Sequence, residues 1–470
     1  MESTSKSAWT KKLDAVEEFE RTPVPEHKLK GAASFWGMYA GEHIAGTEFV
    51  IGPLFVAHGV GARDLVSGLL LGNVLAVLSW AFICAPIATK SRSTLYYQLE
   101  KICGPRLALV YNVVNALMFC FLAGSMIAVS ATAVGIPFKM TMPSLNDFYP
   151  NSIGWIVAVL GIGAATTIVA MFGYTQVARF ANYAVPWMIL MFIAAPIAVL
   201  PNLGIHSFSE FWPVANEKIW TGIPLAGQSK FTFWHVMFFA WFCNLAMHIG
   251  MSDLSILRYA RKWHYGFSTS IGMFVGHYIA WLASGILYAL FLLESNQSME
   301  FAPGPIAYRA AGFAGVVCVI AAGWTTANPT IYRAGLALQA LMPGSKTWKV
   351  TMIIGLVTTL AACFPALVMK LLDFVALYGL ILMPMGAVIF SDFWLLPKLS
   401  LKQDYAEWQQ IIFSWPAALT WGVTLLISFL LPVELFFKAL PGWFIAIGLY
   451  TSLAYVQQRV HSKALAGAKI

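Results

Sequence analysis

The chain of 470 residues is 59% hydrophobic and only 11% charged, whereas soluble globular proteins contain about 25% charged residues. This composition excludes a soluble or disordered protein, and the 29 basic residues form no run that would indicate a nucleic-acid-binding surface. The six cysteines are scattered singly, so neither a disulfide framework nor a zinc site is expected. Because a membrane-spanning helix needs about 20 mostly apolar residues, the sequence predicts a protein that crosses the membrane many times.

Twelve apolar segments are candidates for membrane-spanning helices. They lie near residues 33–58, 64–89, 106–135, 152–173, 179–200, 231–252, 268–293, 313–339, 348–367, 371–395, 410–431 and 435–457. The first 32 residues are polar and lack the apolar core of a signal peptide, so we expect this tail to stay in the cytoplasm. The longest loop, residues 201–230, is rich in aromatic residues and suits an interfacial cover.

The distribution of lysine and arginine predicts the orientation in the membrane. With both termini on one side, that side carries 22 of the 29 basic residues, among them Arg258 and Arg333, and the opposite side carries seven. Because cytoplasmic loops are enriched in basic residues, we expect both termini in the cytoplasm and the protein in the plasma (inner) membrane. The formal net charge of +8 is therefore a consequence of topology.

Ionisable residues in the first predicted span indicate a functional site. Glu42, His43 and Glu48 lie where Gly41 and Gly46 loosen the helix, and a charge at mid-membrane costs about 2.5–3.5 kcal/mol unless it faces a cavity or a partner. Exposed backbone carbonyls at that depth are tolerated only beside a cavity, where transporters hold a cation and a solute. The alternatives are a neutral, hydrogen-bonded Glu42 and a packing His43. The six-residue spacing predicts different roles for the two glutamates.

The sixth predicted span brings aromatic and polar side chains to a similar depth. Trp241 and Phe242 precede Asn244 and His248. A flat solute with polar edges would stack on such rings and form hydrogen bonds with Asn244 or His248. For any single ring, packing or lipid contact is the alternative interpretation.

Two adjacent hydroxyls in the eighth predicted span suggest a cation site. Thr325 and Thr326 point in directions about 100° apart on a helix, and together with carbonyls of a broken first span they would complete an oxygen shell for a hard monovalent cation. The alternative is hydrogen bonding of both hydroxyls to the preceding turn. Asn328-Pro329 frees a backbone carbonyl one turn earlier, which favours the cation site.

Three segments resemble the nucleobase–cation symporters, the family of cytosine, purine, allantoin and hydantoin permeases. Residues 322–328 are similar to the family's Trp-(Ser/Thr)-Thr-Asn segment, and residues 384–393 to its Pro…Gly…Ile…Asp-(Tyr/Phe) ending. Residues 253–261 are similar to its Asp-Phe-x-Arg-Tyr-x-(Arg/Lys) ending. Order and spacing agree over about residues 30–455, nearly the whole chain.

The resemblance implies an all-α membrane fold of two inverted five-helix repeats, residues 33–200 and 231–395, in which helices one and six are broken. Two further helices would occupy residues 396–457, with an external loop at 201–230 and cytoplasmic tails at 1–32 and 458–470. Alternating access around a central site is implied as well.

The resemblance also implies a sodium site. Its ligands would be the backbone carbonyls of Glu42, Ala45 and Ala322 and the hydroxyls of Thr325 and Thr326. Substrate would lie between aromatic rings of spans three and six. The resemblance places Phe119 or Phe121 and Trp241 or Phe242 on either side of the substrate, with Gly46 and Asn328 at its edges. Glu48 and Asn244 are further substrate-binding candidates, and Glu42, Glu48 and His248 are coupling candidates, because they are polar groups at membrane depth.

The sequence departs from the family at several substrate positions. The usual tryptophan and neighbouring glutamine of span three are absent, Asn328 is shifted by one position, and Ile331 or Tyr332 replaces a later asparagine. Glu42, His43 and Glu48 are not standard in their segment. The scaffold is therefore predicted more firmly than the substrate.

We expect a secondary active transporter that couples sodium or proton movement to uptake of a nucleobase or related heterocycle. The alternative is the same scaffold carrying a vitamin precursor, an amino acid or a quaternary amine. An enzyme or a channel is less favoured, and no HExxH, GxSxG, Walker or paired-cysteine motif is present. The expected partners are a small-molecule substrate, Na+ or H+ and the lipid bilayer, without nucleic acid or an enzymatic cofactor.

Overall fold

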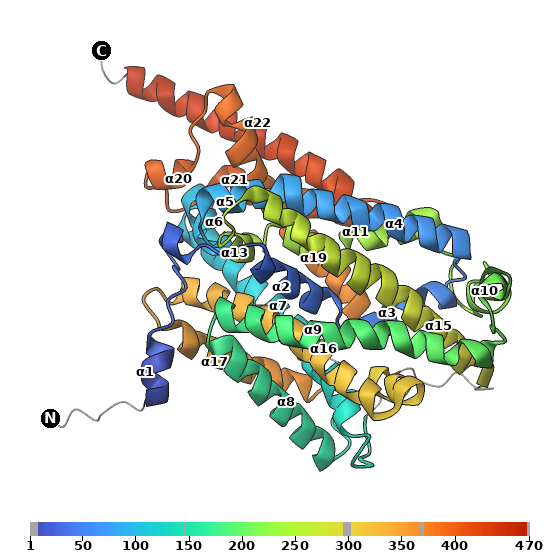
Figure 1. Ribbon diagram of the computed structural model, residues 1–470. Helices are drawn as coiled ribbons and strands as arrows, with labels where there is room; N and C mark the ends of the chain where they lie inside the picture. Colours follow the sequence, from blue (N-terminus) through green and yellow to red (C-terminus); the bar gives the residue numbers. More distant parts are fainter. Residues whose placement is uncertain (1–7, 144–146, 295–301, 367–370, 468–470) are drawn as a thin grey trace.

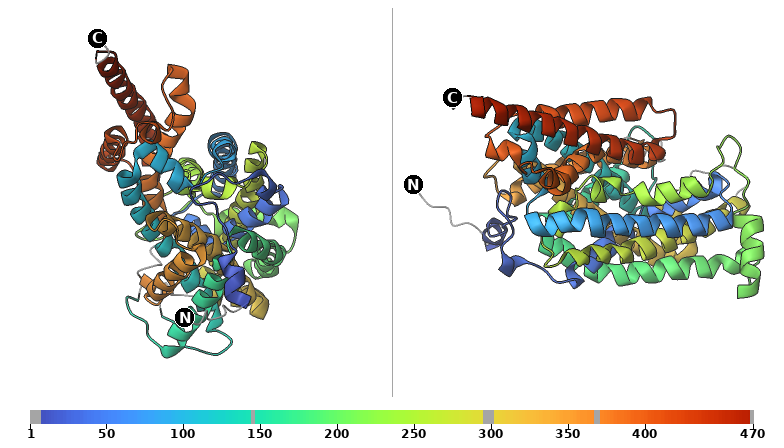
Figure 2. Two further views of the ribbon diagram at one scale, coloured as in Figure 1. Left: turned by 90° about the vertical axis from the view of Figure 1, so that its left-hand side faces the viewer. Right: turned by 90° about the horizontal axis from the view of Figure 1, so that it is seen from above.

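The computed structural model describes residues 8–143, 147–294, 302–366 and 371–467, and this part of the chain consists of helices joined by loops. The helices run roughly side by side along one direction (Figures 1 and 2). The first helix, α1 (Ala8–Asp14), and the C-terminal end of the last helix lie at the same end of this bundle. We call it the terminal end, and the opposite end, where α10 (Phe208–Val214) lies, the loop end.

The helices correspond to the twelve predicted spans. Eight of the described helical stretches are long and apolar enough to cross a membrane, and four shorter apolar helices belong to the remaining spans. In chain order the spans are α2 (Ala33–His43) with α3 (Glu48–Ala57); α4 (Ala62–Ser79) continued by η2 (Trp80–Cys84) and α5 (Ala85–Ser91); α7 (Pro105–Val134); α8 (Ile153–Met171); α9 (Tyr174–Val199); α11 (Phe233–Phe242) with α12 (Leu245–His248); η6 (Gly272–Ile279) with α15 (Ala280–Glu294); α16 (Pro303–Leu341); α17 (Thr347–Ala362); α19 (Leu371–Phe390); α21 (Trp415–Leu430); and α22 (Ala439–Gly467). Most predicted boundaries are close, but α16 begins at Pro303 and bends at Ala311 and Gly312.

The first and sixth spans are interrupted, which agrees with the predicted breaks. The first span breaks between α2 and α3, where Ile44 leaves the helical conformation (φ −93°, ψ 59°). A Cβ atom on Gly46 would lie 2.4 Å from Val129 Cγ1 of α7, so the absence of a side chain lets the break approach α7 closely. The sixth span breaks between α11 and α12, where Asn244 has φ −109° and ψ 32°.

The spans form two groups, and the first span, which belongs to one of them, also contacts the other. In one group α2 packs on η6, α3 on α15 and α4 on α11; in the other α7 packs on α16 and α8 on α17. The α8–α17 contact is reciprocal, because Gly163 faces Thr359 and Gly355 faces Thr167, and a Cβ atom on either glycine would lie 2.2 Å from the threonine hydroxyl. Because α2 also contacts α16, the first span is in contact with both groups.

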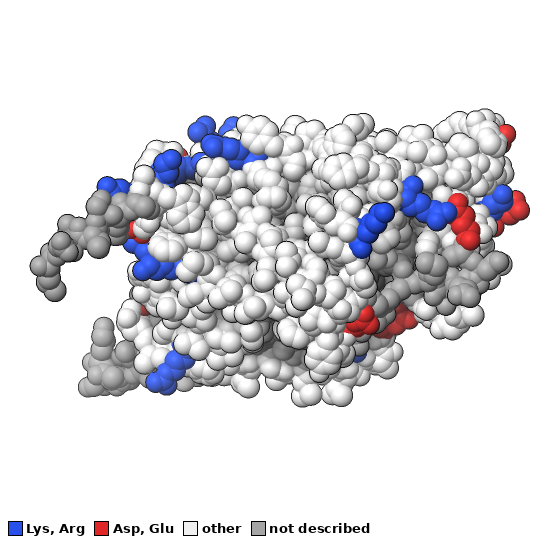
Figure 3. Space-filling view, turned by 90° about the horizontal axis from the view of Figure 1, so that it is seen from below, with Lys and Arg blue, Asp and Glu red and all other residues white. Residues whose placement is uncertain are grey.

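Large apolar side chains cover the outside of the bundle. Leu70 on α4 is 50% exposed, Leu160 on α8 43% and Leu426 on α21 60%. Charged side chains gather toward the two ends of the bundle, and the face between them is almost free of charge (Figure 3). An exposed apolar belt of this extent requires lipid around it, so the protein is a multi-pass membrane protein.

Two basic residues that were counted as loop charges are buried instead. Arg258 and Arg333 are both 0% exposed. Arg333 already falls within the predicted span 313–339, so counting it as a loop charge was wrong, and the structure keeps it inside α16, which continues to Leu341. The prediction that the terminal end faces the cytoplasm therefore depends on the other basic residues, and it stays a prediction.

Candidate substrate and cation site

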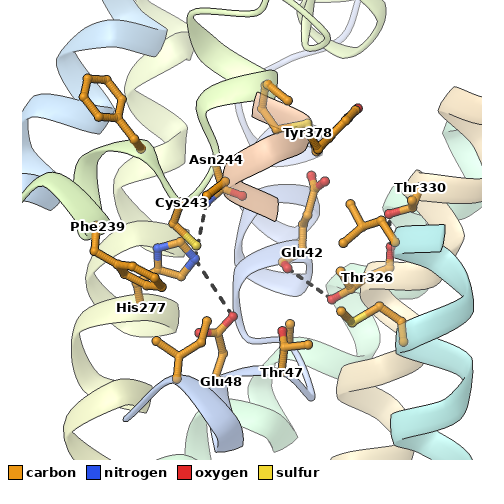
Figure 4. Close-up of a pocket in the computed structure, with 18 of the residues that line it drawn as sticks. Glu42, Thr47, Glu48, Phe239, Cys243, Asn244, His277, Thr326, Thr330 and Tyr378 are labelled. Atoms are coloured by element: carbon orange, nitrogen blue, oxygen red, sulfur yellow. Dashed lines mark hydrogen bonds and ion pairs between the residues drawn. The ribbon is translucent and has the colours of Figure 1, made fainter. Parts of the chain in front are cut away.

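A pocket lies between the breaks of the first and sixth spans (Figure 4). The space between its lining atoms amounts to ≈ 840 Å³, including the part that is open to solvent. Spans one and six supply most of the lining, and α7, η6, α16, α19 and the short helix η9 (Leu435–Lys438) supply the rest. The walls are mostly apolar with a few polar groups, which is typical of sites for small molecules.

Oxygen atoms meet where the break in the first span faces α16. Thr326 Oγ1 lies 3.1 Å from the carbonyl oxygen of Glu42 and 3.1 Å from that of Ala322. Thr325 Oγ1 lies 3.1 Å from the same Ala322 oxygen, and Ala45 follows in the break and lines the pocket. Both hydroxyls thus form hydrogen bonds with the preceding turn, which was the alternative interpretation. The Thr326 hydroxyl also contacts a carbonyl oxygen of α2. Unwound carbonyls with such hydroxyls fit a monovalent cation.

The Glu42 side chain forms a buried ion pair with Arg333. Arg333 Nη1 lies 2.6 Å from Glu42 Oε1, and Nη2 lies 3.0 Å from Oε2. Arg333 Nη2 also donates a hydrogen bond to Asp253 Oδ1. The other oxygen of Asp253 accepts hydrogen bonds from Trp80 Nε1 at 2.6 Å and from the Tyr39 hydroxyl at 3.0 Å. Glu42 therefore contributes its carbonyl to one site and its carboxylate to another.

A second polar group surrounds Glu48 in the pocket (Figure 4). His277 Nε2 lies 4.0 Å from Glu48 Oε1 and 3.4 Å from Asn244 Nδ2. Trp281 Nε1 donates a hydrogen bond to Glu48 Oε2. Carboxylate, imidazole and amide groups thus come together on one wall, where they offer both acceptors and donors to the edge of a bound solute.

The aromatic rings that line the pocket come from spans six and ten. Phe239 and Phe242 belong to α11 and Tyr378 to α19, whereas α7 contributes Leu122 and Met126. Of the predicted substrate-binding aromatic residues, Phe242 therefore lines the pocket.

Phe119 and Phe121, the predicted aromatic residues of span three, are not among the lining residues. Phe119 precedes Leu122 by three residues and lies on the same face of α7, one turn nearer the terminal end. Its ring packs edge-on against Tyr378, with 5.4 Å between ring centroids. A role of either phenylalanine in substrate binding stays a prediction.

Four other predicted residues lie beside the pocket. Trp241 turns toward α4, where its indole donates a hydrogen bond to a serine hydroxyl at 3.0 Å. His248 is buried, and its Nε2 lies 3.0 Å from the carbonyl oxygen of Trp241. Asn328 is buried within α16, and Gly46 lies at the close approach to α7. Their functional roles are untested predictions.

Sequence reasoning gave no site role to three ionisable residues of this region, Asp253, His277 and Arg333. His277 lies in the seventh predicted span, where any ionisable residue is a candidate for function. Arg333 follows Thr326 by seven residues, so helical periodicity places both on one face of α16. These two patterns were available in the sequence, whereas nothing local distinguishes Tyr378 from the other tyrosines.

A second buried network lies toward the terminal end of the bundle. Glu18 Oε2 accepts hydrogen bonds from the hydroxyls of Tyr259 at 2.5 Å and Tyr332 at 2.6 Å, and lies 3.4 Å from Arg258 Nη2. Glu18 Oε1 accepts the backbone N–H of Tyr174 at 3.0 Å. The segment before the first span is thereby tied to α9, to α16 and to the chain that follows span six.

Solved structures with a similar fold are membrane transporters. No protein-family model matches the chain, and no curated protein sequence does either. The nucleobase-cation-symport-1 family transporter Mhp1, closed with bromovinylhydantoin bound, superposes with a TM-score of 0.71 over 92% of this chain and 94% of its own, at 16% identity. Its inward-facing form gives 0.72 over 93% of each chain, also at 16% identity.

A third similar structure is a substrate-bound, outward-open Na+-coupled sialic acid symporter, with a TM-score of 0.67 at 13% identity and coverage of 95% of this chain and 93% of that one. The chain has the fold of these transporters. The predicted fold class, an inverted-repeat membrane transporter with broken first and sixth helices, is therefore confirmed.

Proposed function

We propose that this chain is a secondary active transporter that couples sodium entry to uptake of a nucleobase or related heterocycle. The observation that carries the proposal is the contact of Thr326 with the Glu42 carbonyl at the break of the first span, beside an aromatic-lined pocket. Because cation ligands and pocket share the first span, a bound cation favours the conformation in which that span is ordered, and the solute then binds more tightly.

The pocket suits a flat ring with polar edges. Phe242 and Tyr378 offer aromatic surface for stacking or edge contacts with a ring, while Glu48 and Asn244 offer an acceptor and an amide to its N–H and C=O groups. Bromovinylhydantoin, the compound bound in one Mhp1 structure, is such a ring. A quaternary amine would use the Glu48 carboxylate but not the amide.

Sodium is favoured over a proton as the coupling ion. The oxygens that meet at Thr326 are neutral, and one of the carboxylate candidates, Glu42, is already paired with Arg333. Glu48 and His248 remain the candidates for proton coupling. In the proposed orientation the terminal end is cytoplasmic, so the network around Glu18 closes the inward path while the pocket extends toward η9 at the outer side.

A ligand screen tests the proposed function. Thermal unfolding of the purified chain would be measured with nucleobases, hydantoins, nucleosides, pyrimidine vitamins, amino acids and quaternary amines, in sodium chloride and in choline chloride. We expect stabilisation by a nucleobase-like ring that is larger in sodium, followed by sodium-dependent uptake of that compound into proteoliposomes. Stabilisation by another class alone would assign the scaffold to a different solute. The absence of sodium-dependent uptake of any ring that binds would refute the proposal.

A further inference from the structure

We infer that the buried cluster of Glu42, Asp253 and Arg333 supplies one net negative charge as the counter-charge of the cation site. The inference rests on the proposed function, because it concerns the cation that would bind at Thr325 and Thr326. It goes beyond that function because it states that charged residues without contact to the cation increase the affinity of a site whose own ligands are neutral.

The hydrogen-bond geometry of the cluster fits two ionised carboxylates. Glu42 accepts two hydrogen bonds from Arg333, and Asp253 accepts one from Arg333, one from Trp80 and one from Tyr39. All of these partners are donors, and an ionised carboxylate is acceptor-only. Two carboxylates and one guanidinium therefore leave one negative charge.

No other buried basic group of the described residues balances this charge. The buried arginines are Arg258 and Arg333, and Arg258 is itself paired with Glu18. The buried histidines His43, His248 and His277 each keep one ring nitrogen without a hydrogen-bond partner, which fits a neutral imidazole. An uncompensated charge in the interior of a membrane protein is expensive. A monovalent cation close to the cluster would compensate it, so the cluster favours occupancy of the site.

Glu42 connects the cluster to the cation site directly. Its carbonyl oxygen accepts the Thr326 hydroxyl at 3.1 Å, while its carboxylate lies against Arg333. Arg333 follows Thr326 by seven residues on the same face of α16, about 10 Å along the helix axis. The charge therefore lies between one and two helical turns from the cation. At about 8 Å and an effective dielectric constant of about 20, one unit of charge changes the binding constant roughly thirtyfold.

Three variants separate charge from position. Glu42→Gln keeps the carbonyl ligand and the size of the side chain but brings the net charge of the cluster to zero. Asp253→Asn has the same effect on charge at a residue that is farther from the ligands, and it provides a second test if Glu42→Gln does not fold. The double variant Glu42→Gln with Arg333→Met restores one negative charge, now on Asp253, which keeps its bonds from Trp80 and Tyr39.

The measurement is the sodium concentration that gives half of the maximal thermal stabilisation of the purified full-length chain. Sodium chloride is the only ligand, and choline chloride keeps the ionic strength constant. We expect Glu42→Gln to raise this concentration roughly thirtyfold, Asp253→Asn to raise it several-fold, and the double variant to return toward the wild-type value. A structural role of the ion pair predicts the opposite order, with the double variant weaker than the single one.

Three results would overturn the inference. One is equal sodium dependence in the wild type, Glu42→Gln and Asp253→Asn. The other is a double variant that binds sodium no better than Glu42→Gln. A wild-type chain that sodium does not stabilise also overturns it, since there is then no cation to balance, whereas the proposed transport of a heterocycle is judged separately by uptake.

Discussion

Replacement of Thr326 by valine is the most direct test of the cation site. Valine has nearly the shape of threonine, so the buried packing of this residue, which is 6% exposed, is retained. The change removes one oxygen, which lies 3.1 Å from the carbonyls of both Glu42 and Ala322. Without sodium, the loss of a hydrogen bond between α16 and α2 costs about 1 kcal/mol.

The effect on sodium binding should be larger than the effect on stability. An oxygen that faces a full charge contributes about 1.5–3 kcal/mol, which corresponds to a 10- to 150-fold increase in the dissociation constant, since about 1.4 kcal/mol is a factor of ten. Because a ligand stabilises the folded state according to its concentration relative to this constant, the sodium titration of the unfolding temperature shifts to higher concentration by the same factor.

The matched control is Thr330→Val, one turn further along α16. The Thr330 hydroxyl donates to the carbonyl oxygen of Thr326 at 2.7 Å and also lines the pocket, but it is not a predicted cation ligand. We expect Thr330→Val to leave the sodium titration unchanged. Equal titrations for Thr326→Val and Thr330→Val would refute the assignment of the site.

Three further predictions concern packing, substrate binding and closure. Gly323→Ala should destabilise the protein by about 1–3 kcal/mol, because its Cβ atom would lie 2.6 Å from a backbone carbonyl of α7, and thermal unfolding measures the loss. Glu48→Gln should weaken binding of an N–H-bearing ring about tenfold in saturating sodium, because an amide replaces the carboxyl group that accepts a hydrogen bond from the ring; calorimetry measures the affinity. Glu18→Gln leaves the guanidinium of Arg258 buried without an anion, which costs about 3–5 kcal/mol, so labelling of Cys243 from the terminal side with an impermeant maleimide should increase.

Each of these predictions has a control on the same chain. Gly422→Ala on α21 adds the same methyl group where no atom lies within 4 Å. Glu217→Gln, at an exposed position of η4 (Ala215–Ile219), is the control for Glu48→Gln. Glu17→Gln, at an exposed position beside the buried Glu18, is the control for Glu18→Gln. If a control matches its partner variant in unfolding temperature, ligand affinity or labelling rate, the corresponding physical argument is wrong.

The break in the first span and the hydroxyl pair could be predicted from the sequence because their signals are local, whereas the break in the sixth span was implied by the family resemblance alone. Glycine beside ionisable residues marks the interruption near Gly46, and adjacent Thr325 and Thr326 are visible without any knowledge of neighbouring helices. The substrate wall was less predictable. Phe119 and Leu122 share a face of α7, and only the tilt and axial position of that helix decide that Leu122 reaches the pocket while Phe119 contacts Tyr378.

The ion pair of Arg333 could not be predicted for a related reason. Its partners lie in α2 and in the chain after span six, 291 and 80 residues away, and no local pattern specifies such pairing. Counting Arg333 as a loop charge followed from the assumption that a basic residue near the end of an apolar segment lies outside the membrane. That assumption fails here, because Arg333 lies within α16 and is buried.

The two buried networks are connected through short pieces of rigid chain, which gives cation binding a route to the closed end. Neighbouring residues of α16, Tyr332 and Arg333, belong one to each network. Asp253 and Arg258, which lie five residues apart in the chain after span six, also belong one to each network. A displacement of α2 against α16 at the cation site therefore changes the position of both Arg333 and the Tyr332 hydroxyl. We therefore expect cation binding and closure to be linked by the shift of one packed helix, with no need for a long chain of contacts.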